Sequence, residues 1–211
     1  MTDLQVRPDA SVLLRATDGR LLPLEPGRWH NPPTSCEDAL LRGLDGPALD
    51  VGCGPGRIVE RLIRHGVMAL GIDPSAGAVA IARRRGCPVL QRSVFDRLPG
   101  EGRWSTVLLF DGNVGIGGDP VRLLTRCRTL MGRKGRIVAE VDPPGTGWLS
   151  CNARLERGGE HSPWFPWSVV GVDALPDLAA AAGLAVERVE RRRDDRWFAD
   201  LRPLPRSADG R

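Results

Sequence analysis

The sequence predicts an α/β fold in which a mostly parallel sheet is covered by helices on both faces. Three observations carry this prediction. Between residues 48 and 141, short apolar runs alternate regularly with helical patterns, which is typical of parallel strands joined by crossover helices. A glycine-rich stretch, 50–56, lies between the first of these strands and the first helix. The length of 211 residues suffices for one well-buried domain and is too short for two of full size.

Ordinary boundary signals define the elements of this core. Gly66 and Gly86 end the first two helices, and Pro120 lies in the first turn of the third. Asp194 and Asp195 form the turn between the last two strands, which we expect to pair as a hairpin. The expected strands are 48–51, 68–73, 88–91, 106–110, 135–141, 184–191 and 196–201. The expected helices are 57–65, 75–85, 120–131 and 172–182.

Residues 1–46 are expected to form a cap rather than part of the core. The pair Asp18-Gly19 lies between apolar stretches and predicts a hairpin over 11–24, because this dipeptide favours tight turns. Several prolines then interrupt regular structure, and a helix over 36–44 leads to the first core strand.

A segment rich in glycine, proline and aromatic residues follows the fifth strand, at 142–168. It carries Trp148, Trp164, Phe165 and Trp167, and loops seldom hold so many aromatic side chains unless they pack on something. We therefore expect an insertion that forms a lid. The predicted organisation is a cap over 1–46, one domain over 47–203 that contains this insertion, and a flexible tail over 204–211.

The stretch 50–56 reads Asp-Val-Gly-Cys-Gly-Pro-Gly and has the composition of a loop that binds a nucleotide cofactor. Glycines let the backbone turn tightly and let a ligand approach main-chain atoms. Dinucleotide-binding folds use Gly-x-Gly-x-x-Gly, whereas here the third glycine comes one residue earlier. Asp73 ends the second predicted strand, where its carboxylate would meet a ribose. A dinucleotide-dependent oxidoreductase is therefore a weak alternative.

These motifs resemble those of the class I S-adenosylmethionine (SAM) dependent methyltransferases, including small-molecule methyltransferases of the actinobacterial type. The resemblance covers roughly 48–141, with weaker support to residue 201. It implies a Rossmann-like, seven-stranded, mostly parallel sheet with a reversed C-terminal hairpin, and SAM as a cofactor that leaves as S-adenosylhomocysteine. By similarity, Asp73 would bind the ribose hydroxyls, with Pro74 and Ser75 beside the adenosine. The residues expected around the methionine part are Asp50, Gly52, Cys53, Gly54 and Gly56.

One position departs from the family pattern. The family usually has an acidic residue after the third strand that contacts the adenine amine, and this chain has Ser93 there. We expect Ser93 and the backbone of Val94 to contact adenine instead. Asp96 is an acidic residue nearby, but its spacing is wrong for that role.

Asp111 follows the fourth strand at the carboxyl edge of the sheet, where open α/β folds place their chemistry. It is a candidate for contacting the methionine end of the cofactor or the acceptor. Methyl transfer needs alignment and desolvation of the nucleophile, and an oxygen acceptor would also need a general base. The chain has no tyrosine. The catalytic candidates are Asp111, His161 and His30, with Glu140 and Asp142 as further choices of base.

Composition and the length of the apolar runs limit which partners, metals and cellular locations we expect. The net charge is +4 and lysine is nearly absent, but the arginines are interspersed with acids, so we do not expect a nucleic-acid partner. The five cysteines show neither metal-ligand nor disulfide spacing, so no metal is expected. No apolar run is long enough to cross a bilayer, and the first ten residues do not resemble a signal peptide. We expect a cytoplasmic monomer or homodimer without a membrane partner.

The sequence thus predicts a SAM-dependent methyltransferase that acts on a small-molecule acceptor, in a pathway of the secondary-metabolism kind. An RNA or protein methyltransferase is an alternative, although no Asn-Pro-Pro-Tyr motif follows the fourth strand. A non-catalytic SAM-binding regulator is another, and the Ser93 departure would suit it. The aromatic residues of the insertion are expected to border the acceptor pocket, where they could stack on planar or cationic ligands.

Overall fold

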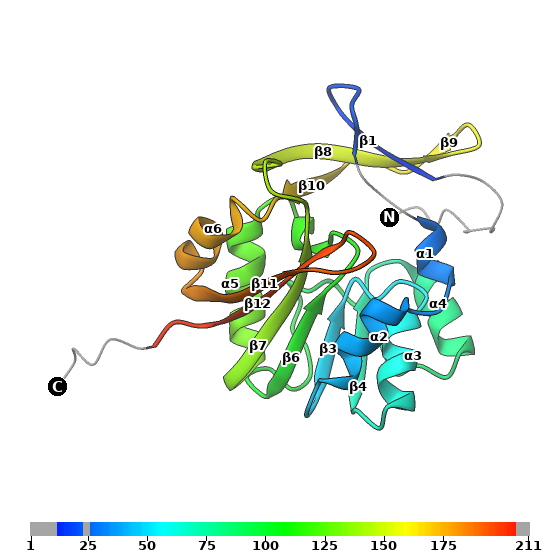
Figure 1. The fold of residues 1–211 in the computed structure, drawn as a ribbon. Coiled ribbons are helices and arrows are strands. Elements are labelled where there is room, and N and C mark those ends of the chain that lie inside the picture. Colours follow the sequence, from blue (N-terminus) through cyan, green and yellow to red (C-terminus); the bar gives the residue numbers. More distant parts are fainter. Residues whose placement is uncertain (1–11, 23–25, 206–211) are drawn as a thin grey trace.

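The computed structural model describes residues 12–22 and 26–205, which form two sheets (Figure 1). The main sheet has seven strands in the order β11-β12-β7-β6-β3-β4-β5. Its strands pair in parallel except β12, which runs antiparallel to both β7 and β11. This confirms the predicted Rossmann-like sheet with its reversed C-terminal hairpin. Its strands are β3 (Ala48–Val51), β4 (Ala69–Asp73), β5 (Val89–Gln91), β6 (Trp104–Leu109), β7 (Met131–Val141), β11 (Leu184–Arg191) and β12 (Trp197–Pro203).

Helices cover both faces of the main sheet, and most of them start where the sequence supplies a side-chain cap or a proline, whereas α3 starts after Gly56 without a side-chain cap. Ser75 accepts a hydrogen bond from the backbone of α4, and Asp119 does the same for α5, in which Pro120 is the first residue. One face carries α2 (Ser35–Arg42), α3 (Arg57–Arg64) and α4 (Ala76–Arg84), and the other carries α5 (Pro120–Leu130) and α6 (Leu175–Ala181) (Figure 1).

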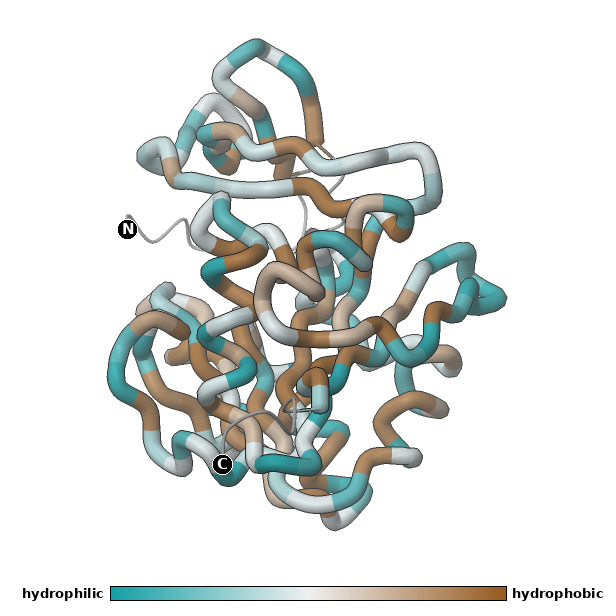
Figure 2. The backbone as a smooth tube through the Cα atoms, turned by 90° about the vertical axis from the view of Figure 1, so that its left-hand side faces the viewer, coloured by the Kyte–Doolittle hydropathy of each residue, from teal (hydrophilic) through white to brown (hydrophobic). Residues whose placement is uncertain are grey.

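The apolar core follows these two layers. One cluster of buried side chains joins the main sheet to α5 and α6, and a second joins it to α2, α3 and α4. The tube coloured by hydropathy shows the apolar segments concentrated inside the main sheet and its helices (Figure 2). In the described ranges, no helix combines the length and the apolar character needed to cross a membrane.

A second, smaller sheet lies at one end of the main sheet (Figures 1 and 2). The predicted N-terminal hairpin is confirmed, since β1 and β2 pair antiparallel with Leu14 opposite Leu22. Strand β1 also pairs with β8, and β8 pairs with β10 and with the short β9. The strands of the small sheet are β1 (Leu13–Ala16), β2 (Leu21–Leu22), β8 (Trp148–Arg157), β9 (Glu160–His161) and β10 (Phe165–Val170).

The peripheral segments have features that the sequence did not predict. The insertion after β7 is built from strands that extend a sheet begun by the N-terminal hairpin, a pairing between segments far apart in sequence. The first 46 residues were expected to be a cap rather than core, yet Leu41 is fully buried beside α3. The short helix α1 (Pro26–His30) was not predicted at all. Residues 1–11 and 23–25 of the expected cap and residues 206–211 of the expected tail lie outside the described residues.

Candidate functional site

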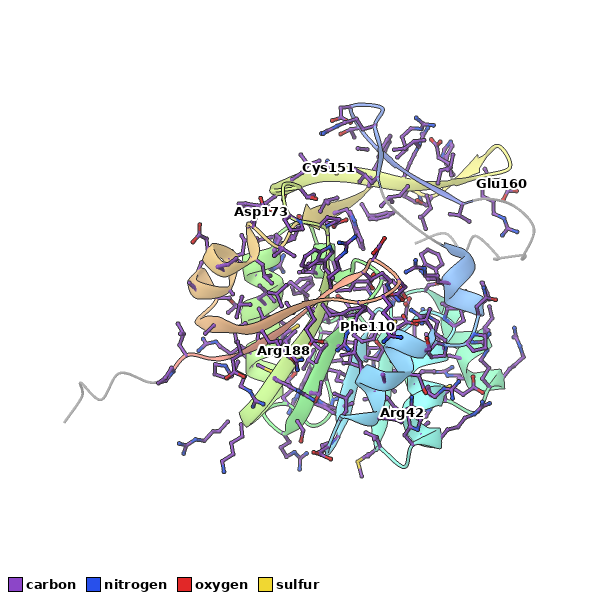
Figure 3. The ribbon with its side chains drawn as sticks, viewed as in Figure 1. Arg42, Phe110, Cys151, Glu160, Asp173 and Arg188 are labelled. Carbon is purple, nitrogen blue, oxygen red and sulfur yellow. The ribbon has the colours of Figure 1, made fainter. Side chains whose placement is uncertain are left out.

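The residues singled out by the glycine motif lie at the carboxyl edge of the main sheet. Strands β3, β4, β6 and β7 are parallel, so the segments that follow them meet at the same edge. The small sheet lies over this edge, because backbone bridges join Asp142 to Gly171 and Ile116 to Trp167. Figure 3 shows Cys151 and Glu160 on the small sheet, with Phe110 at the main sheet below it.

The glycine loop between β3 and α3 requires its three glycines for two different reasons. Gly52, Gly54 and Gly56 all have positive φ angles, of 71°, 51° and 87°. A Cβ at Gly52 would lie 2.6 Å from the side-chain nitrogen of Asn113, and one at Gly56 would lie 2.9 Å from Ala82. A Cβ at Gly54 would meet nothing within 4 Å. The backbone at Gly54 is therefore open to a ligand, while the other two glycines allow close packing.

Neighbouring strand β4 fixes the amides of this loop. The amides of Gly52 and Cys53 donate to the carbonyl of Ile72, at 2.9 and 3.1 Å. The Gly54 amide donates to Asp73 Oδ2 at 2.9 Å, and the Ser75 amide donates to Asp73 Oδ1 at 2.8 Å. Burial raises the pKa of Asp73, while these two amides lower it. Asp73 is thus both a support of the glycine loop and a half-buried carboxylate beside it.

Asp50 is a buried carboxylate at the end of β3. It is 2% exposed, and its Oδ2 atom has no hydrogen-bond partner among the described residues. Burial raises its pKa to about 7; Arg57 opposes this shift, and the carboxylates of Asp111, Asp73 and Glu37 add to it. A buried acceptor without a donor is costly in a folded protein. The position therefore suits a ligand that brings a cationic or hydrogen-donating group.

The remaining predicted cofactor residues differ in what they offer. The side chain of Cys53 packs into the core, since a Cβ at Gly71 would lie 2.6 Å from its Sγ atom, so only its backbone remains for a ligand. Burial also raises the pKa of this thiol, which keeps it protonated. Pro74 is exposed at the start of α4, and Ser75 caps that helix.

The loop after β5 is ordered by its own hydrogen bonds. The Ser93 amide donates to Asp96 Oδ2 at 2.9 Å, and the Ser93 hydroxyl accepts from the amide of Phe95 at 3.3 Å. Val94 is buried in the core, and its carbonyl accepts from Arg126 Nε at 2.9 Å. Asp96 therefore organises the loop, and the half-exposed Ser93 is the polar side chain that stands at the predicted adenine position.

Asp111 belongs to a buried ion network that the sequence did not reveal. Its backbone is in the left-handed region, with φ 55°, and its amide donates to Glu140 at 2.6 Å. Its carboxylate accepts from Arg57 at 2.7 and 2.9 Å. Asp111 therefore has arginine partners and is not a free base. We define the ion network by its five members, Glu37, Arg57, Asp111, Glu140 and Arg196.

The network joins segments that are distant in sequence. Arg57 forms a bidentate pair with Glu37, at 2.8 and 2.9 Å. Arg196 donates to Glu140 at 2.5 and 2.6 Å and lies 2.7 Å from Glu37 in a further ion pair. Burial alone would raise the pKa of Glu37, but the two arginines outweigh burial and lower it to about 2. Both arginine pKa values are raised by their carboxylate partners against the effect of burial.

The two predicted catalytic histidines do not share a location. His161 is exposed on β9, opposite Glu156 on the small sheet, and thus lies on a different sheet from the glycine loop. His30 ends α1, and its Nε2 atom is buried without a partner among the described residues. Burial lowers the pKa of His30, and the charges of Arg85 and Arg157 lower it further. His30 and His161 therefore lie on different elements from each other and from Asp111.

Two residues at this edge, Asp142 and Asn113, were not prominent among the sequence predictions. Asp142 follows β7 and shares its face with Glu140, two residues earlier in the strand. It forms no ion pair within the described part of the chain, and burial, together with the charge of Glu140, raises its pKa to about 6. Asn113 donates to two carbonyls of the glycine loop. Asparagine after a strand is an ordinary turn former, so no sequence signal could have distinguished it.

Comparisons with known proteins agree with this geometry. Residues 48–135 match the sequence profile of a family described as "Methyltransferase domain". The search of curated protein sequences gives no significant match. Among solved structures, a SAM-dependent methyltransferase from Bacteroides fragilis, in complex with S-adenosyl-L-homocysteine, is similar with a TM-score of 0.76 at 19% identity, covering 94% of this chain and 90% of that one.

Two further structures are similar over most of the chain. The CcbJ methyltransferase from Streptomyces caelestis has a TM-score of 0.65 at 17% identity, covering 84% of this chain and 92% of that one. A 1,6-didemethyltoxoflavin-N1-methyltransferase from Burkholderia thailandensis, with its substrate and S-adenosylhomocysteine bound, has a TM-score of 0.57 at 19% identity, covering 80% and 77%. Residues 48–135 are thus similar to a methyltransferase domain, and the chain shares the fold of these solved methyltransferase structures.

Proposed function

We propose that the chain transfers the methyl group of SAM to a small-molecule acceptor bound between the main-sheet edge and the small sheet. The observation that carries this proposal is the glycine loop, in which an open backbone at Gly54 lies between the buried Asp50 and the half-buried Asp73. The residues fit SAM, because Asp50 Oδ2 lacks a donor that the ammonium of its methionine part would supply. Bound SAM supplies an electrophilic methyl group on a sulfonium.

The residues of the chain divide the work of holding the cofactor. Asp73 keeps lone pairs free beside its two amide donors, and a carboxylate matches the two hydroxyls of a ribose. The carboxylate of Asp50 would stabilise a cationic group at the other end of the ligand. The half-exposed Ser93 would donate to adenine in place of the usual acid. Together with Cys53, Gly56 and Pro74 as backbone or surface contacts, these positions form the proposed cofactor site.

The small sheet presents an apolar face toward this site. Its alternation and register place one set of side chains on the same face as Trp167. Trp167 itself lies against the turn after β6, since a Cβ at Gly115 would lie 3.0 Å from its ring. This face favours an acceptor with an apolar or planar part, of the kind named in the toxoflavin methyltransferase complex. The face consists of Leu14, Ala16, Cys151, Ala153, Leu155, Phe165 and Trp167.

Asp142 is our candidate for the general base if the acceptor carries a proton that must leave. Asp111 and Glu140 are engaged by arginines, whereas Asp142 forms no ion pair with any described residue. Its raised pKa of about 6 brings its titration nearer to neutral pH, where a general base is most effective. An Asp142→Asn variant is expected to retain SAM binding and to lose turnover, provided that deprotonation limits the rate.

Calorimetric titration with SAM, S-adenosylhomocysteine and NAD tests the cofactor assignment without the acceptor. We expect both adenosyl ligands to bind and NAD to fail. Production of S-adenosylhomocysteine from SAM is then measured over a panel of planar phenols, amines and heterocycles. Tighter binding of NAD than of SAM would contradict the proposed function. The cytoplasmic location and the monomeric or homodimeric state stay predictions, and sedimentation analysis checks the latter.

A further inference from the structure

The turn after β6 contacts the glycine loop through the side chain of Asn113. Residues Asn113–Gly115 form the 3-10 helix η1, which begins after Gly112, a residue with φ 76°. The backbone amide of Asn113 donates to the carbonyl of Phe110 at 3.0 Å, which closes the turn at the end of β6. The side chain of Asn113 thereby leaves the strand end and reaches the neighbouring β3 edge.

Both hydrogens of the Asn113 side-chain amide are donated to carbonyls of the glycine loop. Its Nδ2 atom donates to the carbonyl of Val51 at 2.8 Å and to the carbonyl of Gly52 at 3.0 Å. The amides of the same loop are held from the opposite side, by Ile72 and Asp73 on β4. The loop is therefore held at its amides by β4 and at the Val51 and Gly52 carbonyls by Asn113 of η1.

The close approach of Asn113 also explains the glycine at position 52. A Cβ there would lie 2.6 Å from Nδ2 and 2.9 Å from the Asn113 side-chain carbon, closer than real Cβ contacts come. The left-handed φ of 71° at Gly52 adds to this requirement. The loop conformation and the asparagine contact therefore depend on each other.

Helix η1 has no room to move away from the loop. Behind it, a Cβ at Gly115 would lie 1.9 Å from the carbonyl oxygen of Ser168 on β10. Val114 is 1% exposed and packs in the main core cluster. The turn is thus held between the glycine loop and the small sheet, so the position of Asn113 is set by packing and not by its own two hydrogen bonds alone.

We propose that Asn113 is a positioning residue that holds the glycine loop in the conformation that binds the adenosyl cofactor. This inference rests on the proposed function, because it assumes that the glycine loop is the cofactor site. Asn113 acts through the Val51 and Gly52 carbonyls, and it need not touch the cofactor. Hydrogen bonds to two adjacent carbonyls pre-organise the loop backbone, so that the backbone loses less conformational freedom when the ligand binds.

The test compares Asn113→Ala and Asn113→Asp with the wild-type protein by calorimetric titration with S-adenosylhomocysteine. At pH 8 we expect Kd to rise about 10-fold or more in both variants, since each loses both donated bonds. The aspartate is similar in shape, but its carboxylate would face two carbonyls without a hydrogen to donate. Circular dichroism confirms that each variant is folded at the titration temperature. The matched controls are Asn152→Ala and Asn152→Asp, because Asn152 is exposed on β8.

A pH profile separates positioning from a general structural role. A protonated aspartate at position 113 can donate one hydrogen bond, so the Kd ratio of Asn113→Asp to wild type should fall toward pH 5.5. The ratio for Asn113→Ala should stay constant. Asp50 on β3, Asp111 with Arg57 and Arg196, Glu140 and Asp142 on the β7 side also carry charge near this turn. They are present in all these proteins, so the ratio to wild type removes their common contribution.

The outcomes are distinguishable. If the wild-type protein binds no adenosyl ligand, the proposed function is wrong. If it binds and both Asn113 variants bind equally well, the role of Asn113 is wrong while the proposed function stands. If both variants lose affinity by the same factor at every pH, the loss comes from packing, and positioning by hydrogen bonds is contradicted.

Discussion

Asp73 is the residue at which the sequence motif and the structure agree most directly. Its two carboxylate oxygens accept from the amides of Gly54 and Ser75 at 2.9 and 2.8 Å, so the carboxylate is oriented before any ligand arrives. A carboxylate held in this way loses little freedom on binding a ribose. Its position at the end of β4 also follows from the apolar strand that the sequence shows.

We expect Asp73→Ala to weaken SAM binding by about 1–3 kcal/mol, because a charge-assisted hydrogen bond is lost together with a support of the loop. Asp73→Asn keeps one acceptor oxygen and should lose less. Calorimetric titration measures both changes, with Asp45→Ala as a control at an exposed turn. Unchanged affinity in Asp73→Ala would remove this residue from the cofactor site.

Asp50 gives the stability of the protein a particular pH dependence. Its folded-state pKa of about 7 lies above the ordinary value of 3.8, so between these values the folded protein holds a proton that the unfolded chain has released. The stability associated with that proton is fully present below about pH 4 and is lost as the pH rises through about 7. Asp142, with a pKa raised to about 6, acts in the same direction.

We therefore expect the free energy of unfolding without ligand to fall by about 1–3 kcal/mol between pH 5 and pH 8 through Asp50. Urea unfolding of wild type, Asp50→Asn and Asp142→Asn at both pH values measures this contribution. Glu37 does not interfere, because its pKa of about 2 and its ordinary value both lie below this range. An equal pH dependence in wild type and Asp50→Asn would contradict the assignment.

At the scale of elements, the 3-10 helix η1 is one of the connections between the two sheets. The glycine at position 115 permits the close contact of η1 with β10, because any Cβ there would collide with the carbonyl oxygen of Ser168 at 1.9 Å. Because that oxygen belongs to the backbone of β10, neither side can yield without moving a strand. The orientation of Trp167 over the proposed acceptor site depends on this contact.

Gly115→Ala is therefore expected to destabilise the protein by about 1–3 kcal/mol, the usual cost of overpacking. Gly132→Ala is the matched control, because a Cβ there meets its nearest atom at 3.5 Å, an ordinary contact. Urea unfolding compares the two variants. Equal stability of both variants would show that β10 adjusts freely. It would contradict the prediction that a Cβ at position 115 destabilises the protein.

The elements of the main sheet could be predicted because each is encoded locally. Strand β3 spans Ala48–Val51 and β11 spans Leu184–Arg191, the same bounds that their apolar runs indicate. Helix α4 ends before Gly86 and α5 starts at Pro120, as their caps imply. The small sheet could not be predicted in this way, because β1 finds its partner β8 more than a hundred residues later in the chain.

At the scale of the whole molecule, the ion network connects the N-terminal segment to the carboxyl edge of the main sheet. Glu37 on α2 is fully buried and pairs with Arg57 on α3 and with Arg196 before β12. Removing one partner of a buried ion pair leaves an uncompensated charge, which is more costly than losing a surface pair. The segment before the glycine loop is therefore part of the site's support.

We expect Glu37→Gln to destabilise the protein by about 3–5 kcal/mol, because two buried arginines would lose a shared carboxylate. Glu60→Gln is the control, since it breaks only the i,i+4 pair with Arg64 on the surface of α3. Thermal unfolding monitored by circular dichroism ranks the two. A loss for Glu37→Gln no larger than that of Glu60→Gln would show that the network contributes little.

The sequence by itself determined the Rossmann-like fold, the glycine loop and the two acids, Asp50 and Asp73, that flank it. These features depend on contiguous residues, whose spacing sets strand, turn and helix through local backbone and packing preferences. The location of His161 on β9 and the burial of Leu41 show where such reasoning ends, because neither residue type nor spacing indicates where those segments pack.

Only the tertiary structure decided the surroundings of the loop. It placed Asn113 against the glycine carbonyls, engaged Asp111 with Arg57, and set the small sheet over the carboxyl edge. Each of these contacts joins residues that are far apart in sequence, and each forms only when the main sheet brings strand ends to one edge. Burial at that edge then sets the pKa values of Asp50 and Asp142, and burial is a property of the folded chain.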